Sequence, residues 1–251
     1  MSARNRWHSP VAVLLFSVAL LAVTLPAASK ASAKGRGCPE GMADVGGKYC
    51  IDRYEAHTVE IIAKNKTRSH SPYVPIDGLR VRAVSKKGKV PQGYISRDQA
   101  AEACTNAGKR LCTDDEWIGA CRGKKPTTYP YGDAHVAGRC NDRGVSSFNA
   151  LYGLAGAPPT RDAYSFENMN NPQLNQMKGT VAKSGDFKKC RSSFGVYDMV
   201  GNLHEWTASQ SGTFRGGYFL DVHINGDGCE YKTTAHNGRY HDYSTGFRCC
   251  K

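Results

Sequence analysis

The chain has 251 residues, with 34 Lys or Arg against 22 Asp or Glu and a formal net charge of +12. Its basic residues are scattered and no base-stacking motif accompanies them, so the composition argues against a nucleic-acid-binding protein. The charge instead favours solubility or contact with anionic envelope polymers. None of the ten cysteines forms a CxxC pair, so zinc binding and thioredoxin-like chemistry are poorly supported.

The first 33 residues have the pattern of a secretory signal peptide. Arg4 and Arg6 precede an apolar run over 11–25, and small residues over 31–33 supply a cleavage site. The run is too short to span a membrane comfortably, although an uncleaved anchor is the alternative. We therefore expect a signal peptide over 1–33 and a single domain over 34–251. This domain is expected in the periplasm or outside the cell, with no transmembrane segment after leader cleavage.

All ten cysteines lie in the part predicted to be exported, and an even number there predicts up to five disulfides. Cys38 and Cys50 enclose a strand–turn–strand pattern, which a bond between them would close. Cys140 and Cys190 frame the turn-rich stretch 124–189 and are a second candidate pair. The polar segment over 64–71 is expected to be a loop.

Two capping boxes predict the helices. Ser96 with Gln99 begins a helix that Gly108 ends, and Thr113 with Glu116 begins another that runs to about Arg122. Further along, strands are expected over 213–220 and 245–250. Few helices, short strands and many loops predict an α+β fold.

The run over 194–206 is the most informative stretch of the sequence. It combines the oxygen-bearing side chains of Asp198, Asn202 and Glu205 with glycines at Gly195 and Gly201. Oxygen ligands on a backbone kinked by glycine suit a hard cation such as calcium. The alternative is a buried turn whose polar groups satisfy one another.

Several ordered motifs from Met42 to the C-terminus resemble one family. They are YDMVGNLHEW over 197–206, FRGGY over 214–218, GFRC over 246–249, and an upstream block over 96–123 that contains GKRL and CRG. The chain resembles the formylglycine-generating enzyme, or sulfatase-modifying factor, family. This resemblance implies a C-type-lectin-like fold with little regular secondary structure, tied by disulfides.

The resemblance also implies disulfides and calcium ligands at matching positions. The implied bridges are Cys104–Cys249 and Cys121–Cys229, which leave Cys112 and Cys250 as candidates for an additional one. The implied calcium ligands are the side chains of Asp198 and Glu205 with the backbone carbonyls of Gly201 and Leu203. A second family calcium site begins at an asparagine that resembles Asn141, but its aspartate partner is not identifiable in this sequence.

The chain departs from the family where catalysis is concerned. Formylglycine-generating enzymes need two thiols after the glycine pair, and these thiols bind copper. After Gly217 this chain has no cysteine until Cys229, and Asp221 stands at the position of the first thiol. The resemblance therefore implies a family member without formylglycine-generating activity.

Other members with this fold are PvdO-like maturation proteins and non-haem iron enzymes. Asp221, His223 and His204 are candidates for an iron site, since two histidines and a carboxylate suit ferrous iron. The alternative is that His204 packs in the interior and His223 lies in a solvated loop.

Three functional hypotheses follow. The first is a calcium-stabilised binding module that recognises an exported protein, a peptide or an envelope glycan. The second is a metal-dependent oxidase or maturation factor that modifies an exported protein and uses iron or copper as its cofactor. The third is a small structural protein of the envelope.

Overall fold

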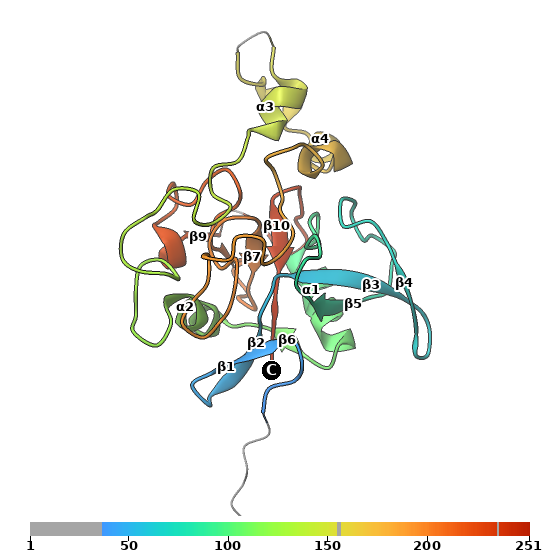
Figure 1. Ribbon diagram of the computed structural model, residues 1–251. Coiled ribbons are helices and arrows are strands. Elements are labelled where there is room, and N and C mark those ends of the chain that lie inside the picture. The colour runs from blue at the N-terminus through green and yellow to red at the C-terminus, as the bar shows by residue number, and fades with distance from the viewer. Residues whose placement is uncertain (1–36, 155–156, 235) are drawn as a thin grey trace, which may run out of the picture. The chain divides into compact units, whose positions relative to one another are not determined.

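The computed structural model describes residues 37–154, 157–234 and 236–251 (Figure 1). The predicted signal peptide lies outside these residues. The described residues all belong to one unit. In the part of the chain that the structure describes, no helix has the length and apolar character needed to cross a membrane.

An N-terminal hairpin begins the first sheet. Strands β1 (Met42–Val45) and β2 (Tyr49–Asp52) pair antiparallel around a turn that contains Gly46 and Gly47, both with positive φ. The sheet order is β1-β2-β11-β6, so strands β6 (Arg110–Leu111) and β11 (Cys249–Cys250) complete it. The C-terminal end of the chain is thereby fixed beside the N-terminal hairpin (Figure 1).

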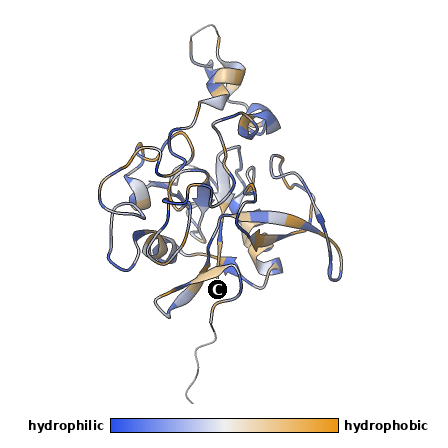
Figure 2. Ribbon diagram, in the orientation of Figure 1, coloured by the Kyte–Doolittle hydropathy of each residue, from blue (hydrophilic) through white to orange (hydrophobic). Residues whose placement is uncertain are grey.

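A three-stranded antiparallel sheet follows, in the order β4-β3-β5. Its strands are β3 (Ala56–Ala63), β4 (Lys66–Ser69) and β5 (Val81–Ser85). Strand β4 lies in the segment that we expected to be a loop, so that expectation was wrong. All four of its residues are exposed and the strand is hydrophilic (Figure 2), because it is an edge strand with no buried face. Its position is set by the turn at Asn65, which has φ +60°, and not by apolar alternation.

The third sheet holds the central run of the sequence. Its order is β10-β7-β8-β9, with β10 parallel to β7 and the other neighbours antiparallel. The strands are β7 (His204–Trp206), β8 (Phe214–Arg215), β9 (Lys232–Thr233) and β10 (Thr245–Phe247).

Two predicted strands are shorter than expected. The strand expected over 213–220 stops at Arg215, because Gly216 and Gly217 take φ +83° and +72°. A Cβ at Gly216 would lie 2.5 Å from the carbonyl oxygen of Met199, and one at Gly217 would lie 2.2 Å from that of Asp221. The strand expected over 245–250 is divided between two sheets, since Arg248 separates β10 from β11.

The two predicted helices are confirmed. Helix α1 (Arg97–Asn106) begins at the Ser96–Gln99 capping box, and helix α2 (Asp114–Arg122) begins at the Thr113–Glu116 capping box. The turn-rich stretch contains only short helices. These are α3 (Ser147–Tyr152), η1 (Arg161–Ala163), α4 (Phe166–Met169) and η2 (Pro172–Asn175), with η3 (Gly228–Glu230) later in the chain.

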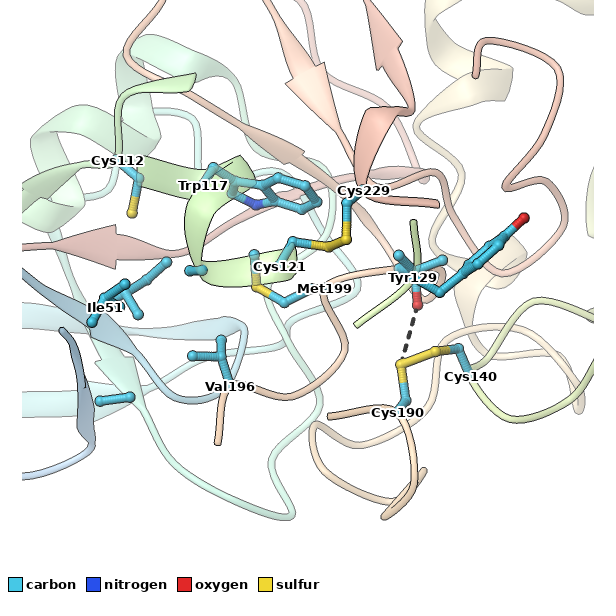
Figure 3. Packing of buried hydrophobic residues seen from close by; sticks show 14 of the residues in the cluster. Ile51, Cys112, Trp117, Cys121, Tyr129, Cys140, Cys190, Val196, Met199 and Cys229 are labelled. Carbon is cyan, nitrogen blue, oxygen red and sulfur yellow. Dashed lines mark hydrogen bonds between the residues drawn. A yellow bond between two sulfur atoms is a disulfide. The ribbon is translucent and has the colours of Figure 1, made fainter. Parts of the chain in front are cut away.

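Five disulfides tie these short elements together. The structure joins Cys104 to Cys249 and Cys121 to Cys229, the two bridges that the resemblance implied. It also joins the three remaining candidate pairs, Cys38–Cys50, Cys112–Cys250 and Cys140–Cys190. Figure 3 shows the bridges at Cys121 and Cys140 in one apolar cluster with Trp117 and Tyr129. With so little regular structure, these bridges restrict the unfolded chain and help to stabilise the fold.

Candidate functional site

The turn before β7 is held in an unusual backbone conformation. Asp198 and Asn202 have φ +55° and +63°, although they are not glycines, and Gly201 has φ +77°. A Cβ at Gly201 would lie 2.2 Å from the carbonyl oxygen of Asn141, so only glycine fits there. Three residues within five positions thus have left-handed backbone conformations. Such conformations persist where the surrounding contacts impose them.

A buried ion pair lies at the end of this turn. Glu205 is 1% exposed and Arg248 is fully buried, and the guanidinium donates to both carboxylate oxygens at 2.5 Å. The indole Nε1 of Trp117 also donates to Glu205, at 2.8 Å. Arg248 further donates to the carbonyl oxygens of Asp52 and Tyr197, so the ion pair connects three parts of the chain.

Glu55 belongs to the same cluster, which sequence reasoning did not reveal. Its carboxylate accepts hydrogen bonds from Asn202 Nδ2 at 2.6 Å and from the Leu203 amide at 3.3 Å. Glu55 is buried and directly precedes β3, which begins at Ala56. An acidic residue next to a buried strand was the available signal, but only the fold brings it to a turn almost 150 positions away.

The cluster contains three carboxylates and one guanidinium. Burial raises the pKa of Glu55 well above its usual value, and repulsion from Asp198 and Glu205 raises it further. Burial also raises the pKa of Asp198 to about 7, with a further contribution from Glu205. The raised pKa values favour the protonated forms of Glu55 and Asp198, which limits the negative charge beside Arg248, and a bound cation would favour their ionised forms instead.

The residues of the implied calcium site fit such a cation in part. Among the hydrogen bonds of the described residues, the Asp198 carboxylate accepts one, through Oδ2 from the Gly185 amide at 2.6 Å. Among the hydrogen bonds that the described residues make outside the strands, none uses the carbonyl of Gly201 or Leu203. Glu205, in contrast, has both oxygens on Arg248. Carboxylate and carbonyl oxygens are suitable calcium ligands.

Over the described ranges, no group of three or more His, Cys, Asp or Glu side chains is arranged to hold a metal ion. The implied calcium set contains only two such side chains and two carbonyls, so calcium there stays a prediction.

Asn141, the candidate ligand of the second calcium site, connects two parts of the chain. Its Nδ2 donates to Asn202 Oδ1 at 2.8 Å and to the carbonyl oxygen of Thr180 at 2.9 Å. Its own carbonyl accepts from the Asn202 amide. The neighbouring Asp142 is also occupied, by His135 and the Gly138 amide. Asn141 thus holds the central turn in place.

A separate cavity of about 480 Å³ opens beside β7 and is mostly aromatic. The residues that line it are Tyr164, Phe166, Met169, His204, Tyr218, His236, Tyr240, Asp242, Tyr243 and Ser244. Tyr164 and Phe166 are about half exposed, at 52% and 53%. Cavities of this size with an aromatic lining and a few polar groups are typical of ligand sites. Apart from His204 and Tyr218, sequence reasoning missed this set, although the alternation of Tyr, His and Asp over 240–243 was a signal.

His204 forms part of the cavity wall. It is 6% exposed, and its ring lies 4.7 Å from that of Phe214 and 4.9 Å from that of Tyr218. Burial lowers its pKa to about 3, so the imidazole is neutral in the folded protein near pH 7. Among the described residues, no group hydrogen-bonds to Nδ1. His204 therefore contributes a neutral, buried imidazole to the cavity wall.

The structure does not bring Asp221, His223 and His204 together as a metal site. Asp221 accepts hydrogen bonds from the amides of His223 and Ile224, and from Tyr231 Oη at 2.8 Å. The His223 ring pairs instead with Asp227 at 2.7 Å. Of the three candidates, only His204 lines the aromatic cavity.

All ten cysteines of the sequence lie within the described residues, and none is free. Cys229, the first cysteine after the glycine pair, is bonded to Cys121 in the core. The segment after Gly217 therefore carries no thiol.

Comparison with known proteins places this arrangement in a family. Residues 47–251 match the model described as the Sulfatase-modifying factor enzyme 1-like domain. The chain is 26% identical over 198 residues to inactive C-alpha-formylglycine-generating enzyme 2 of Bos taurus, covering 71% of this chain and 54% of that protein. It is 32% identical over 104 residues to formylglycine-generating enzyme of Mycobacterium tuberculosis, covering 41% of this chain and 28% of that protein. The chain thus spans about half the length, or less, of these curated relatives.

Two solved structures are similar over most of their length. PvdO from Pseudomonas aeruginosa has a TM-score of 0.41 and 14% identity, with 80% of this chain and 79% of that chain covered. CarF has a TM-score of 0.45 and 16% identity, with coverages of 81% and 85%. The family model covers most of the sequence, and the α+β fold with five disulfides agrees with what the resemblance implied. The chain therefore belongs to the family of the Sulfatase-modifying factor enzyme 1-like domain.

Proposed function

We propose that this protein is an exported, calcium-stabilised binding module without formylglycine-generating activity. The observation that carries the proposal is that all ten cysteines are in disulfides. The family's chemistry uses two thiols, which exchange with a substrate cysteine and bind copper, and a disulfide-bonded sulfur cannot act as a thiolate. Five disulfides are also typical of proteins in an oxidising compartment outside the cytosol.

The relatives support the loss of activity. Two of the proteins that match over 71% of this chain are named inactive C-alpha-formylglycine-generating enzyme 2. Members of this family thus exist that keep the domain without the activity. We infer the same loss of activity for the present chain, which has Asp221 at the position of the first thiol.

Binding is assigned to the aromatic cavity. Tyr164 and Phe166 expose aromatic faces at its rim, while His204 and Asp242 supply polar groups deeper in the wall. Aromatic faces stack on apolar side chains and on sugar rings, and the polar groups fix the orientation of the ligand. We assign the cavity to a peptide or glycan segment of an exported partner.

Calcium has a structural role in this proposal. When bound at the turn between Asp198 and Glu205, it would favour the ionised forms of the buried carboxylates there. Asp198 and the carbonyls of Gly201 and Leu203 would hold it there. The turn leads directly into β7, so calcium would also fix the position of His204 in the cavity.

The alternative is an iron- or copper-dependent oxidase, for which the described residues provide no converging set of metal ligands. Asp221 is engaged by Tyr231 and by backbone amides, and His223 is paired with Asp227. Elemental analysis of the purified protein separates the two functions. The binding module contains calcium, whereas stoichiometric iron or copper would favour the oxidase.

A binding experiment tests the proposal. The purified protein is screened against immobilised glycans and peptides, and the affinity of each hit is measured for two alanine variants. Phe166→Ala removes an exposed ring from the cavity rim and should weaken binding about tenfold. Ile224→Ala removes an even more exposed side chain, at 82%, outside the cavity and should leave the affinity unchanged. If both variants lose affinity equally, or if both bind with the affinity of the wild type, the binding site lies outside the aromatic cavity.

A further inference from the structure

A second cavity, of about 660 Å³, is lined by basic residues and shares no residue with the aromatic cavity. We call it the basic groove. It is lined by Arg122, Lys124, Lys125, Thr127, Pro130, Tyr131, Gly132, Arg139, Lys188, Lys189, Arg191, Ser192 and Ser193. Seven of these thirteen residues are Lys or Arg and none is Asp or Glu.

Few of these charges are neutralised by the protein. Arg122 pairs with Glu230 at 2.7 Å. Arg139 stacks on the Tyr131 ring, with 4.7 Å from its Cζ to the ring centroid. The four lysines form no ion pair with any described residue, and all four are exposed. Like charges gathered in this way repel one another, so an anionic ligand in the groove is favoured.

The fold holds the basic segments together covalently. The Cys140–Cys190 disulfide joins Arg139 to Lys189 and Arg191, which are the immediate neighbours of the two cysteines in the sequence. The groove is therefore largely formed before any ligand arrives, which reduces the entropy lost on binding.

The loop that carries Lys124 and Lys125 is tied to the same wall. The Lys124 amide donates to Ser193 Oγ at 2.7 Å. Gly123 approaches this hydroxyl so closely that a Cβ there would lie 2.4 Å from it. In the described part of the wall, Arg139 Nε and Ser192 Oγ are buried without a hydrogen-bond partner.

We propose that the basic groove binds an anionic polysaccharide, a sugar chain that carries sulfate or carboxylate groups. Flexible lysines act as point charges for anions spaced along a polymer, in contrast to the bidentate geometry of arginine. The exposed Ser193 hydroxyl, which accepts from the Lys124 amide, keeps its own proton to donate to a sugar hydroxyl.

Nucleic acid and acidic peptides fit the groove less well. The one aromatic ring in the lining, that of Tyr131, is covered by Arg139 and is not free to stack on a base. None of the strands defined above contributes a residue to the lining, so a peptide has no strand edge there to extend.

The test uses heparin oligosaccharide as a sulfated probe and alginate oligosaccharide as a carboxylated one. Each is titrated into the full protein at several salt concentrations. The groove variant changes Lys124, Lys125, Lys188 and Lys189 to Gln. The matched control changes four exposed lysines outside the groove, Lys48, Lys64, Lys178 and Lys251, to Gln and therefore alters the net charge equally. All these side chains are exposed, so both variants are expected to fold, and circular dichroism checks this.

The proposal predicts that the wild type binds at least one probe with strong salt dependence. The groove variant should lose at least about tenfold in affinity, and the control should lose less than about threefold. Equal losses in the two variants would overturn the proposal, because net charge alone would then explain binding. Binding of neither probe would overturn it as well. Equally tight binding of duplex DNA or polyglutamate by the wild type would replace the polysaccharide with that ligand class.

Discussion

Replacement of His204 tests whether the aromatic cavity has the electrostatic character described above. His204→Phe keeps an aromatic ring between Phe214 and Tyr218 and removes the titrating nitrogen. Burial lowers the pKa of this histidine from 6.5 to about 3 in the folded protein. The unfolded chain consequently takes up a proton below pH 6.5 that the folded chain refuses, so stability from this group is lost as the pH falls.

The size of the effect follows from the two pKa values. At pH 5 the unfolded state is largely protonated at this position while the folded state is neutral, which lowers the free energy of unfolding by about 2 kcal/mol relative to pH 8. His204→Phe removes this penalty. The variant should therefore gain about 2 kcal/mol over the wild type when the pH is lowered from 8 to 5.

Urea denaturation of both proteins at pH 8 and pH 5 measures the effect. At pH 8 the histidine is neutral in both states, so the difference there is the baseline for packing. Phe also lacks the unpartnered Nδ1, so this baseline should not favour the wild type. Parallel changes in the two proteins between the two pH values would refute the burial of a neutral His204.

Three further perturbations address the ion pair, the calcium turn and the walls of the basic groove. Glu205→Gln removes the one described carboxylate that hydrogen-bonds to the buried Arg248, and it should lower the free energy of unfolding by about 3–5 kcal/mol. Adding Arg248→Met should recover part of this loss, and full stability of the single variant would contradict the ion pair. Calcium at a hundred times its dissociation constant should raise the free energy of unfolding by about 2.7 kcal/mol. Asp198→Ala should abolish this gain, whereas the control Asp186→Ala, at an exposed position, should retain it. An unchanged response in Asp198→Ala would exclude the site. Alanine at both Cys140 and Cys190 opens a 50-residue loop and should cost about 4 kcal/mol as well as weakening probe binding in the basic groove; intact binding would show that the bridge does not shape the groove.

Local signals in the sequence predicted the local elements. The capping boxes at Ser96 and Thr113 fixed the start of both main helices, because a capping box is formed by residues only three positions apart. The same locality explains the failure at β4. That edge strand has no apolar face, and only pairing with β3 makes it a strand.

The candidate site was predictable only where its residues are contiguous in the sequence. The turn from Asp198 to Glu205 is contiguous and was found, together with the absence of thiols after Gly217. Glu55 reaches this turn from a distant strand, and the aromatic cavity combines segments from α4 to the C-terminal region. Such convergence depends on tertiary packing, which no local pattern encodes. The basic groove likewise exists because a disulfide joins segments that are scattered in the sequence.

The most direct test of the account is an assay for formylglycine formation. The purified, non-reduced protein is incubated with copper, oxygen and a sulfatase peptide that contains the target cysteine, with an active family member as positive control. Because all ten cysteines are in disulfides, we expect mass spectrometry to find the peptide cysteine unmodified. Conversion of that cysteine to formylglycine by this protein would contradict the account.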